Sequence, residues 1–343
     1  DVDDAAAVAE ISIEQKETEG LSQGQIVRRR FFRHRGAMVA MVVLIFIVVL
    51  AFTSVGVDLW GFKIPGWWTY SWTQITPKLN NGVPTLSLFP LQFGEHPFGQ
   101  DEVGRDIFAV VMRGAQQSLM VMVIAGVVAT VIGVVIGAVA GYYGKVTDSV
   151  LMRFTDIVIT IPLIVIGAVL GKTFGSLGAA VLGVVIGVFA WTTMARLVRG
   201  EFLSLREREF VDAARVSGAR DRRIIFRHIL PNAVGVIVVN ATLLMAGAIL
   251  LESALSYLGF GVQPPDTSLG KIVSDNQAAF STRPWLFWWP GIFIIAIALC
   301  VNFIGDGLRD AFDPRTKKIP SQRQMDKAMA QFATGNASTE GVK

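Results

Sequence analysis

The stretch from Arg196 to Pro231 reads RLVRGEFLSLREREFVDAARVSGARDRRIIFRHILP and lies between two apolar runs of membrane length. It holds nine arginines and no lysine, in a chain whose residues are 52% hydrophobic. Charges at this density are too costly for the hydrocarbon core of a bilayer. We therefore expect this arginine block to be a cytoplasmic loop of a membrane protein.

The composition of the whole chain agrees with a membrane protein. Its mean hydropathy is +0.52, and 17% of its 343 residues are charged. The single cysteine, Cys300, lies in an apolar run and excludes both an intrachain disulfide and a cysteine-based metal site. We expect no metal and no cofactor to be bound by this chain.

Apolar runs of roughly 20 residues predict spanning helices. The third run is long enough for two spans, and Gly171 to Gly175 (GKTFG) predicts the turn between them. The chain is therefore predicted to be all-α, with six transmembrane helices. The expected spans are Ala37–Val57, Ser118–Gly141, the two halves of Ile157–Arg196, Asn232–Leu251 and Pro284–Gly305.

The distribution of basic residues predicts the orientation. If both termini are cytoplasmic, 24 of the 31 Lys and Arg residues lie on the inner side and seven on the outer side. The positive-inside rule then places the termini and the arginine block in the cytoplasm. Tryptophans at the predicted outer ends of the first and sixth spans favour an interfacial aromatic belt over a stacking site for substrate. They are Trp60, Trp67, Trp68, Trp72, Trp285, Trp288 and Trp289.

These features divide the chain into a cytoplasmic N-terminal segment (1–36), a six-helix membrane domain (37–308) and a cytoplasmic tail (309–343). The first twenty residues and the tail after Pro320 are predicted to be disordered. Residues 25–36 (QIVRRRFFRHRG) predict an interfacial helix on membrane lipid. Nucleic-acid binding is the alternative for this basic segment, but nothing else in the sequence favours a nucleic-acid partner.

Inside the arginine block, Glu207–Val216 has the composition of a helix, and Gly218 supplies a left-handed stop. Asp221 is predicted to cap a second helix over Arg222–Leu230, which Pro231 ends before the fifth span. This pair of helices with a glycine corner has a partly apolar face that can fit a groove on a partner. The alternative is a solvated loop that merely follows the positive-inside rule.

The block also carries a motif. Asp212-Ala213-Ala214, then Gly218, then Ile229-Leu230-Pro231, resembles the "EAA" loop of permease subunits in binding-protein-dependent ABC importers. The usual form is EAA, three residues, Gly, nine residues and I-x-L-P. Here Asp212 replaces the Glu and keeps its charge, and His228 stands at the first Ile position.

Three further segments are similar to the C-type permease of bacterial dipeptide and oligopeptide importers. They are residues 96–106 (HPFGQDEVGRD, with Gln100 where Thr is usual), 256–265 (SYLGFGVQPP) and 305–315 (GDGLRDAFDPR). With the EAA loop, the resemblance covers residues 28–315 in the family's order.

The resemblance implies a type I ABC importer transmembrane fold in a bacterial cell membrane, with cytoplasmic coupling helices. It implies four kinds of neighbour: a second homologous permease, two cytoplasmic ATPases that use ATP and Mg, an extracytoplasmic peptide-binding protein, and lipid. Peptide is the implied cargo, with nickel, glutathione or another solute as alternatives. By analogy, the ATPase-docking groove takes Asp212, Ala213, Ala214 and Gly218, with Arg215 and Arg220 on its rim.

The resemblance gives the chain no catalytic activity of its own, and the residues agree. Gly167 to Thr173 (GAVLGKT) imitates a phosphate loop but lacks one residue between its glycines and faces outward. His34, His96 and His228 lie in distant segments without metal-ligand spacing. A stand-alone secondary transporter or channel is the second hypothesis, but neither internal inverted repeats nor charged midplane residues stand out.

Two acids and a set of glycines complete the predictions. Asp156 is expected to pair with Arg153 one turn away. Glu252 ends the fifth span and is expected either to face the pathway or to lie at the headgroups. The long outer segment, about 58–113, is expected to be a folded loop with extended pieces that meets the binding protein or caps the pathway. Glycines at four-residue spacing predict close helix contacts, within the chain or with a partner. They are Gly133, Gly137, Gly141, Gly183 and Gly187.

Overall fold

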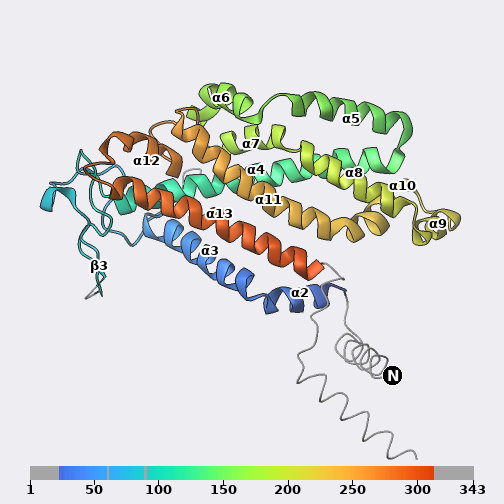
Figure 1. The fold of residues 1–343 in the computed structure, drawn as a ribbon, viewed down its shortest axis with the longest axis horizontal. Helices are drawn as coiled ribbons and strands as arrows, with labels where there is room; N and C mark the ends of the chain where they lie inside the picture. The colour runs from blue at the N-terminus through green and yellow to red at the C-terminus, as the bar shows by residue number, and fades with distance from the viewer. Residues whose placement is uncertain (1–22, 60–61, 89–90, 313–343) are drawn as a thin grey trace, which may run out of the picture.

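The computed structural model describes residues 23–59, 62–88 and 91–312, which form a helical bundle with two small hairpins at one end (Figure 1). Four helices in this part of the chain are long and apolar enough to cross a membrane. They are α3 (Arg35–Ser54), α4 (Ile107–Tyr143), α11 (Leu230–Tyr257) with its lead-in from Asp221, and α13 (Trp285–Phe312).

Two bent helix pairs raise the number of candidate spans to six, as predicted. Helices α5 (Lys145–Thr160) and α6 (Leu163–Phe174) meet at 75°, and α7 (Ala179–Ala190) and α8 (Thr192–Arg206) at 48°. Pro162 explains the first bend, because proline forces the residue before it out of the helical region. The turn predicted within the third apolar run, at Gly171 to Gly175, is present but begins later. Helix α6 continues to Phe174, and the chain turns in η2 (Gly175–Leu177) and at Gly178.

The outer segment between α3 and α4 is folded with extended pieces, as expected. Strands β1 (Val57–Leu59) and β2 (Phe62–Ile64) pair antiparallel, as do β3 (Ser87–Leu88) and β4 (Leu91–Gln92), with η1 (Asn80–Gly82) between the hairpins. The segment ends at Asp106, which caps α4, so the residues from Ile107 onward belong to the helix. A second outer piece between α11 and α13 holds α12 (Leu269–Asp275) and η4 (Gln277–Ala279).

The glycines at four-residue spacing mediate contacts within the chain, which settles the alternative left open by the sequence. A Cβ added at Gly137 of α4 would lie 2.5 Å from the carbonyl oxygen of Ala195 in α8. One added at Gly187 of α7 would lie 2.8 Å from the carbonyl oxygen of Ala125 in α4. Because only hydrogen fits at these points, α4 packs backbone to backbone against both halves of the bent pair α7–α8.

The arginine block contains one separate helix rather than two. Helix α9 (Glu209–Val216) ends before Gly218, whose φ of 74° confirms the predicted left-handed corner. The predicted second helix with a break at Pro231 is wrong: α10 (Asp221–Arg223) runs through the π-helix η3 (Ile224–Ile229) directly into α11. The wider π turn accommodates a proline that has no N–H to donate.

The basic N-terminal segment forms α2 (Gln23–Arg33), which leads into α3 through His34. The Nδ1 atom of His34 accepts from the backbone N–H of Ala37 at 3.0 Å and caps α3. Its Nε2 lies 3.4 Å from a carboxylate oxygen of Asp310 in α13. The predicted disordered ends and Trp60 lie outside the described residues.

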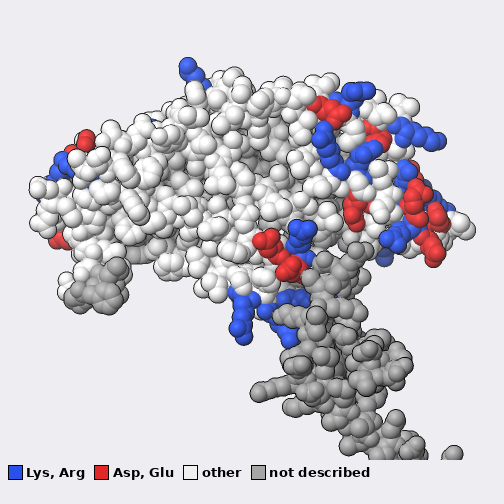
Figure 2. All heavy atoms as spheres, in the orientation of Figure 1, with Lys and Arg blue, Asp and Glu red and all other residues white. Residues whose placement is uncertain are grey.

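Charged side chains gather at the end of the bundle that carries α8, α9 and α10, and around α2, while the middle of the visible face is almost free of them (Figure 2). The hairpins and α12 lie toward the opposite end (Figure 1). This separation is what a helical bundle that crosses a bilayer requires.

Candidate coupling site and transmembrane cavity

Helix α9 is attached to the bundle by one face. Val211 is fully buried and Ala214 is 8% exposed, and both belong to an apolar cluster that includes Phe202, Ile224 and Ile229. Residues three apart on a helix share a face, so Val211 and Ala214 point inward together. The methyl group of Ala214 therefore packs against its own chain, and the place of Ala214 in a docking groove stays a prediction.

The opposite face of α9 is exposed and mixes charge with apolar surface. Asp212 and Ala213 lie on it, and Nη1 of Arg215 contacts Oδ1 of Asp212 at 3.0 Å. Val216 is 91% exposed, and Phe226 of η3 is 61% exposed. Large apolar side chains with this exposure mark a surface that a partner can cover.

The corner after α9 lies on the same exposed end. Gly218 and Arg220 are exposed, and Arg220 precedes α10. A Cβ added at Gly218 would meet nothing within 4 Å, so its requirement is the positive φ rather than space. Of the predicted docking residues, Asp212, Ala213, Arg215, Gly218 and Arg220 thus share one accessible end.

The first arginines of the block do not reach this end but bind the chain itself. Arg199 forms a two-point pair with Asp148 of α5, with Nη2 to Oδ2 at 2.6 Å. Arg196 contacts Asp156 of α5, with Nη2 to Oδ1 at 2.6 Å. The predicted pairing of Asp156 with Arg153 is wrong, because α8 places Arg196 beside Asp156.

Arg206 and Asp221 tie the block to the C-terminal end of α4. Nη1 of Arg206 donates to the carbonyl oxygens of Gly141 at 3.3 Å and Tyr142 at 3.2 Å. These are terminal carbonyls of α4, where a positive charge also favours the helix dipole. Asp221 makes no helix cap, contrary to the prediction; its Oδ1 accepts from the Tyr142 hydroxyl at 2.8 Å.

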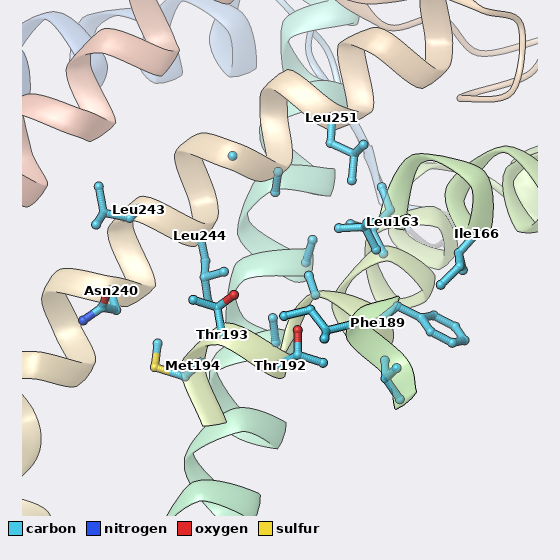
Figure 3. Close-up of a pocket in the computed structure, with 18 of the residues that line it drawn as sticks. Leu163, Ile166, Phe189, Thr192, Thr193, Met194, Asn240, Leu243, Leu244 and Leu251 are labelled. Atoms are coloured by element: carbon cyan, nitrogen blue, oxygen red, sulfur yellow. The ribbon is translucent and has the colours of Figure 1, made fainter. Parts of the chain in front are cut away.

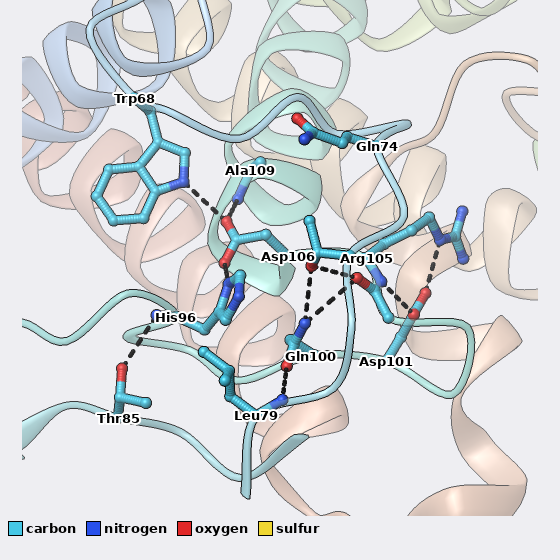
Figure 4. Close-up of polar contacts among 12 residues, drawn as sticks. Trp68, Gln74, Leu79, Thr85, His96, Gln100, Asp101, Arg105, Asp106 and Ala109 are labelled. Carbon is cyan, nitrogen blue, oxygen red and sulfur yellow. Dashed lines mark hydrogen bonds and ion pairs between the residues drawn. The ribbon is translucent and has the colours of Figure 1, made fainter. Parts of the chain in front are cut away.

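At the opposite end of α4, the segment 96–106 forms a buried polar cluster (Figure 4). His96 Nδ1 and Asp106 Oδ1 lie 2.8 Å apart, and the two residues are 2% and 1% exposed. The second carboxylate oxygen accepts from Trp68 Nε1 and from the backbone N–H of Ala109, both at 2.9 Å. Asp106 therefore fastens the outer segment to the first turn of α4.

Gln100 uses its amide as both donor and acceptor inside the outer segment. Its Oε1 accepts from the backbone N–H of Leu79 at 2.8 Å, and its Nε2 donates to Thr76 Oγ1 at 2.9 Å. Beside it, Arg105 Nε donates to Asp101 Oδ2 at 2.6 Å (Figure 4). Segment 96–106, which the sequence offered only as a motif, is thus held in its folded shape by these polar contacts.

Several tryptophans pack into this region. Trp289 stacks on Phe98 with 3.9 Å between ring centroids and 9° between planes. Trp67 and Trp288 are each 59% exposed and stay available to the interface, so the aromatic belt stays a prediction.

Tyr70 lies over the His96 ring, with 4.5 Å between centroids. Burial, together with the nearby carboxylates of Glu95 and Asp106, raises the pKa of the Tyr70 phenol. Tyr70 therefore stays neutral at physiological pH.

The comparisons with known proteins identify the family. Residues 133–318 match the family described as binding-protein-dependent transport system inner membrane component, and residues 22–73 match the N-terminal TM domain of oligopeptide transport permease C. The chain belongs to this permease family. The resemblance found in the sequence is thereby confirmed.

Full-length relatives carry the same description, oligopeptide transport system permease protein OppC. The protein from Haemophilus influenzae is 37% identical over 305 residues, which cover 89% of this chain and 93% of the relative. That from Escherichia coli K12 is 40% identical over 304 residues, covering 89% and 95%. That from Mycobacterium tuberculosis H37Rv is 36% identical over 303 residues, covering 88% and 98%.

In this permease the two bent helix pairs line a partly open cavity of about 500 Å³ together with α4 and α11 (Figure 3). Its walls are mainly aliphatic, and the polar side chains among them are Thr192, Thr193 and Asn240. No charged side chain of the described residues lines it. Such a chamber accepts apolar groups and offers a few hydrogen-bonding positions to polar ones.

Glu252 does not line this cavity, and its expected place at the pathway or at the headgroups stays a prediction. Its side chain is fully buried and accepts from Ser118 Oγ at 2.8 Å and from Ser256 Oγ at 2.6 Å. Ser118 Oγ in turn accepts from the backbone N–H of Leu269 at 3.2 Å. The carboxylate thus joins α4, α11 and the start of α12.

Proposed function

We propose that this chain is the C-type permease subunit of a bacterial ABC importer for peptides. The exposed end formed by α9 and the Gly218 corner carries the proposal, because it presents charge and apolar surface at the polar end of a membrane bundle. On this proposal a second homologous permease completes the translocation pathway. The chain itself is proposed to be non-catalytic, and two cytoplasmic ATPases bind ATP with Mg and hydrolyse it.

The coupling surface is assigned to Asp212, Ala213, Arg215, Gly218 and Arg220, which share the exposed end. Ala214 contributes indirectly, because it packs beneath α9 and holds this helix on the bundle. Its burial beside Val211 and Ile224 supports this role. Both termini and this end lie in the cytoplasm, in keeping with the excess of inner basic residues. The outer segment fastened by Asp106 faces the extracytoplasmic binding protein.

Peptide cargo is proposed because relatives 37% and 40% identical to this chain carry the name of oligopeptide permeases. The cavity between the bent spans supports it, since uncharged aliphatic walls with Asn240 and Thr193 suit side chains of many kinds. Nickel, glutathione and other solutes are the alternatives that the experiment separates from peptide.

The test is to purify the membrane complex through a tag on this chain, identify the copurifying proteins and reconstitute the complex in vesicles. We expect a second permease and ATPase subunits, and ATP-dependent uptake of labelled oligopeptides when the binding protein is added. Competition by nickel or glutathione but not by peptides would reassign the cargo. Full-rate uptake by the isolated chain without nucleotide would contradict the proposal and favour a secondary transporter or channel.

A further inference from the structure

Helix α5 lies on the outside of the bundle and is weakly packed. Thr155 is the only buried residue among its 16. An apolar stripe along it is exposed, with Val146 76%, Val150 61% and Ile157 60% accessible. A helix with so little buried surface depends on specific contacts for its position.

Two ion pairs to α8 supply those contacts. Asp148 near the start of α5 binds Arg199, and Asp156 near its end binds Arg196. The two aspartates are eight residues apart, which is about 12 Å along an α-helix. The order is reversed on α8, so the helices run antiparallel and are held at two separated points.

Helix α8 in turn belongs to the same packed unit as the coupling surface. Phe202 of α8 and Val211 of α9 are both fully buried in one apolar cluster, two residues of chain separate the helices, and Arg206 binds the end of α4. A displacement of α9 therefore carries α8 with it, because close-packed interiors transmit movement rather than absorb it.

The two bends lie side by side at the cavity. Trp191, 4% exposed, stands between α7 and α8 and stacks on Phe154 of α5 with 6.0 Å between centroids and 19° between planes. The other bend, at Pro162, lines the cavity together with Thr192. Movement of α5 together with α8 consequently shifts both bends against the wall of the cavity that α11 supplies.

We infer that the pairs Arg199–Asp148 and Arg196–Asp156 are a tether through which α8 and α9 drag α5, so that the Pro162 bend repositions α6 and the cavity opens or closes. The inference rests on the proposed function. It makes the two arginines positioning residues, distinct from the docking surface at Asp212 and Ala213.

The two pairs differ in their exposure to water. The side chains of Arg196 and Asp156 are 46% and 51% exposed. Those of Arg199 and Asp148 are less accessible, at 34% and 16%, so water competes less for this pair. Partly solvated pairs of this kind add little to the stability of the protein.

The test compares transport per ATP hydrolysed in the reconstituted complex. The variant Asp148→Asn with Asp156→Asn keeps the size of both side chains and removes both charges. We expect ATPase subunits to copurify as in the wild type and binding-protein-stimulated hydrolysis to continue, while peptide uptake per ATP falls about tenfold, within the usual range of coupling between sites.

A charge swap, Asp148→Arg with Arg199→Asp, should restore uptake relative to either single change. The matched control is Asp275→Asn with Lys271→Gln, which removes an outer ion pair 3.1 Å long and should leave the ratio unchanged.

An unchanged uptake-to-ATP ratio in the Asp148→Asn, Asp156→Asn complex would overturn the inference. So would loss of the ATPases from that complex, because the pairs would then support docking instead of transmission. A wild-type complex that shows no ATP-dependent uptake would contradict the proposed function itself, which separates the two failures.

Discussion

The hydroxyl of Tyr142, at the C-terminal end of α4, donates a hydrogen bond of 2.8 Å to Asp221, the residue that opens the helix leading into the fifth span. The bond joins α4 to the loop that carries α9. The neighbouring Tyr143 is 51% exposed, so the two tyrosines form a natural pair of test sites.

Tyr142→Phe should lower stability by about 1.5–3 kcal/mol, the usual net worth of a hydrogen bond to a charged group. Tyr143→Phe should change it little. Thermal unfolding of the purified complex measures both. Equal melting temperatures for the two variants would show that the bond does not hold the loop.

The Gly218 corner depends on its positive φ. Gly218→Ala should cost about 1–2 kcal/mol, because an L-residue resists the left-handed region, and should reduce the amount of ATPase that copurifies. Gly200 in α8 is the control, since a Cβ there also meets nothing within 4 Å and the backbone is helical. Gly200→Ala should be neutral or stabilising. Full ATPase recovery with Gly218→Ala would argue against the corner as part of the docking surface.

Adjacent alanines in α9 separate packing from docking. Ala214→Leu should destabilise by about 1–3 kcal/mol through overpacking of the cluster beneath α9. Ala213→Leu should leave the melting temperature unchanged and weaken ATPase binding instead. Ala214→Leu should therefore lower the melting temperature, and Ala213→Leu should lower the amount of copurified ATPase. If both variants lose ATPase without any change in melting temperature, the inward position of Ala214 is refuted.

The contrast between these alanines shows where sequence reasoning ends. The six spans, the helix in the arginine block and the left-handed glycine followed from local rules of length, composition and spacing. The direction of Ala214 did not, because it depends on which face of α9 meets Ile224 and Phe202. The partner of Asp156 was missed for the same reason: helical spacing points to Arg153, but the bent spans bring Arg196 alongside. Pro162 within an apolar run was a usable signal for the bend.

A substitution at Glu252 can distinguish a structural role of this buried side chain from a role in binding the cargo. Both serine hydroxyls donate to its carboxylate, so Glu252→Gln leaves one of them facing an amide NH₂, at a cost of about 1–3 kcal/mol for an unsatisfied buried group. We expect a lower melting temperature and unchanged uptake per folded complex. The exposed Glu102→Gln is the control. Reduced uptake at an unchanged melting temperature would instead indicate that Glu252 binds the amino terminus of the peptide.

Asp106 makes the corresponding prediction for the outer segment. Its carboxylate serves the indole of Trp68, the ring of His96 and the backbone of Ala109 at once, and an alanine side chain can accept from none of them. Asp106→Ala should cost about 0.5–2 kcal/mol through the lost helix cap and should expose the segment between α3 and α4 to protease. Asp275→Ala is the control, since Asp275 pairs at the surface with Lys271. Protease resistance equal to the wild type would mean that the tryptophans alone hold the segment, because Trp289 would keep its stack on Phe98 whatever the state of Asp106.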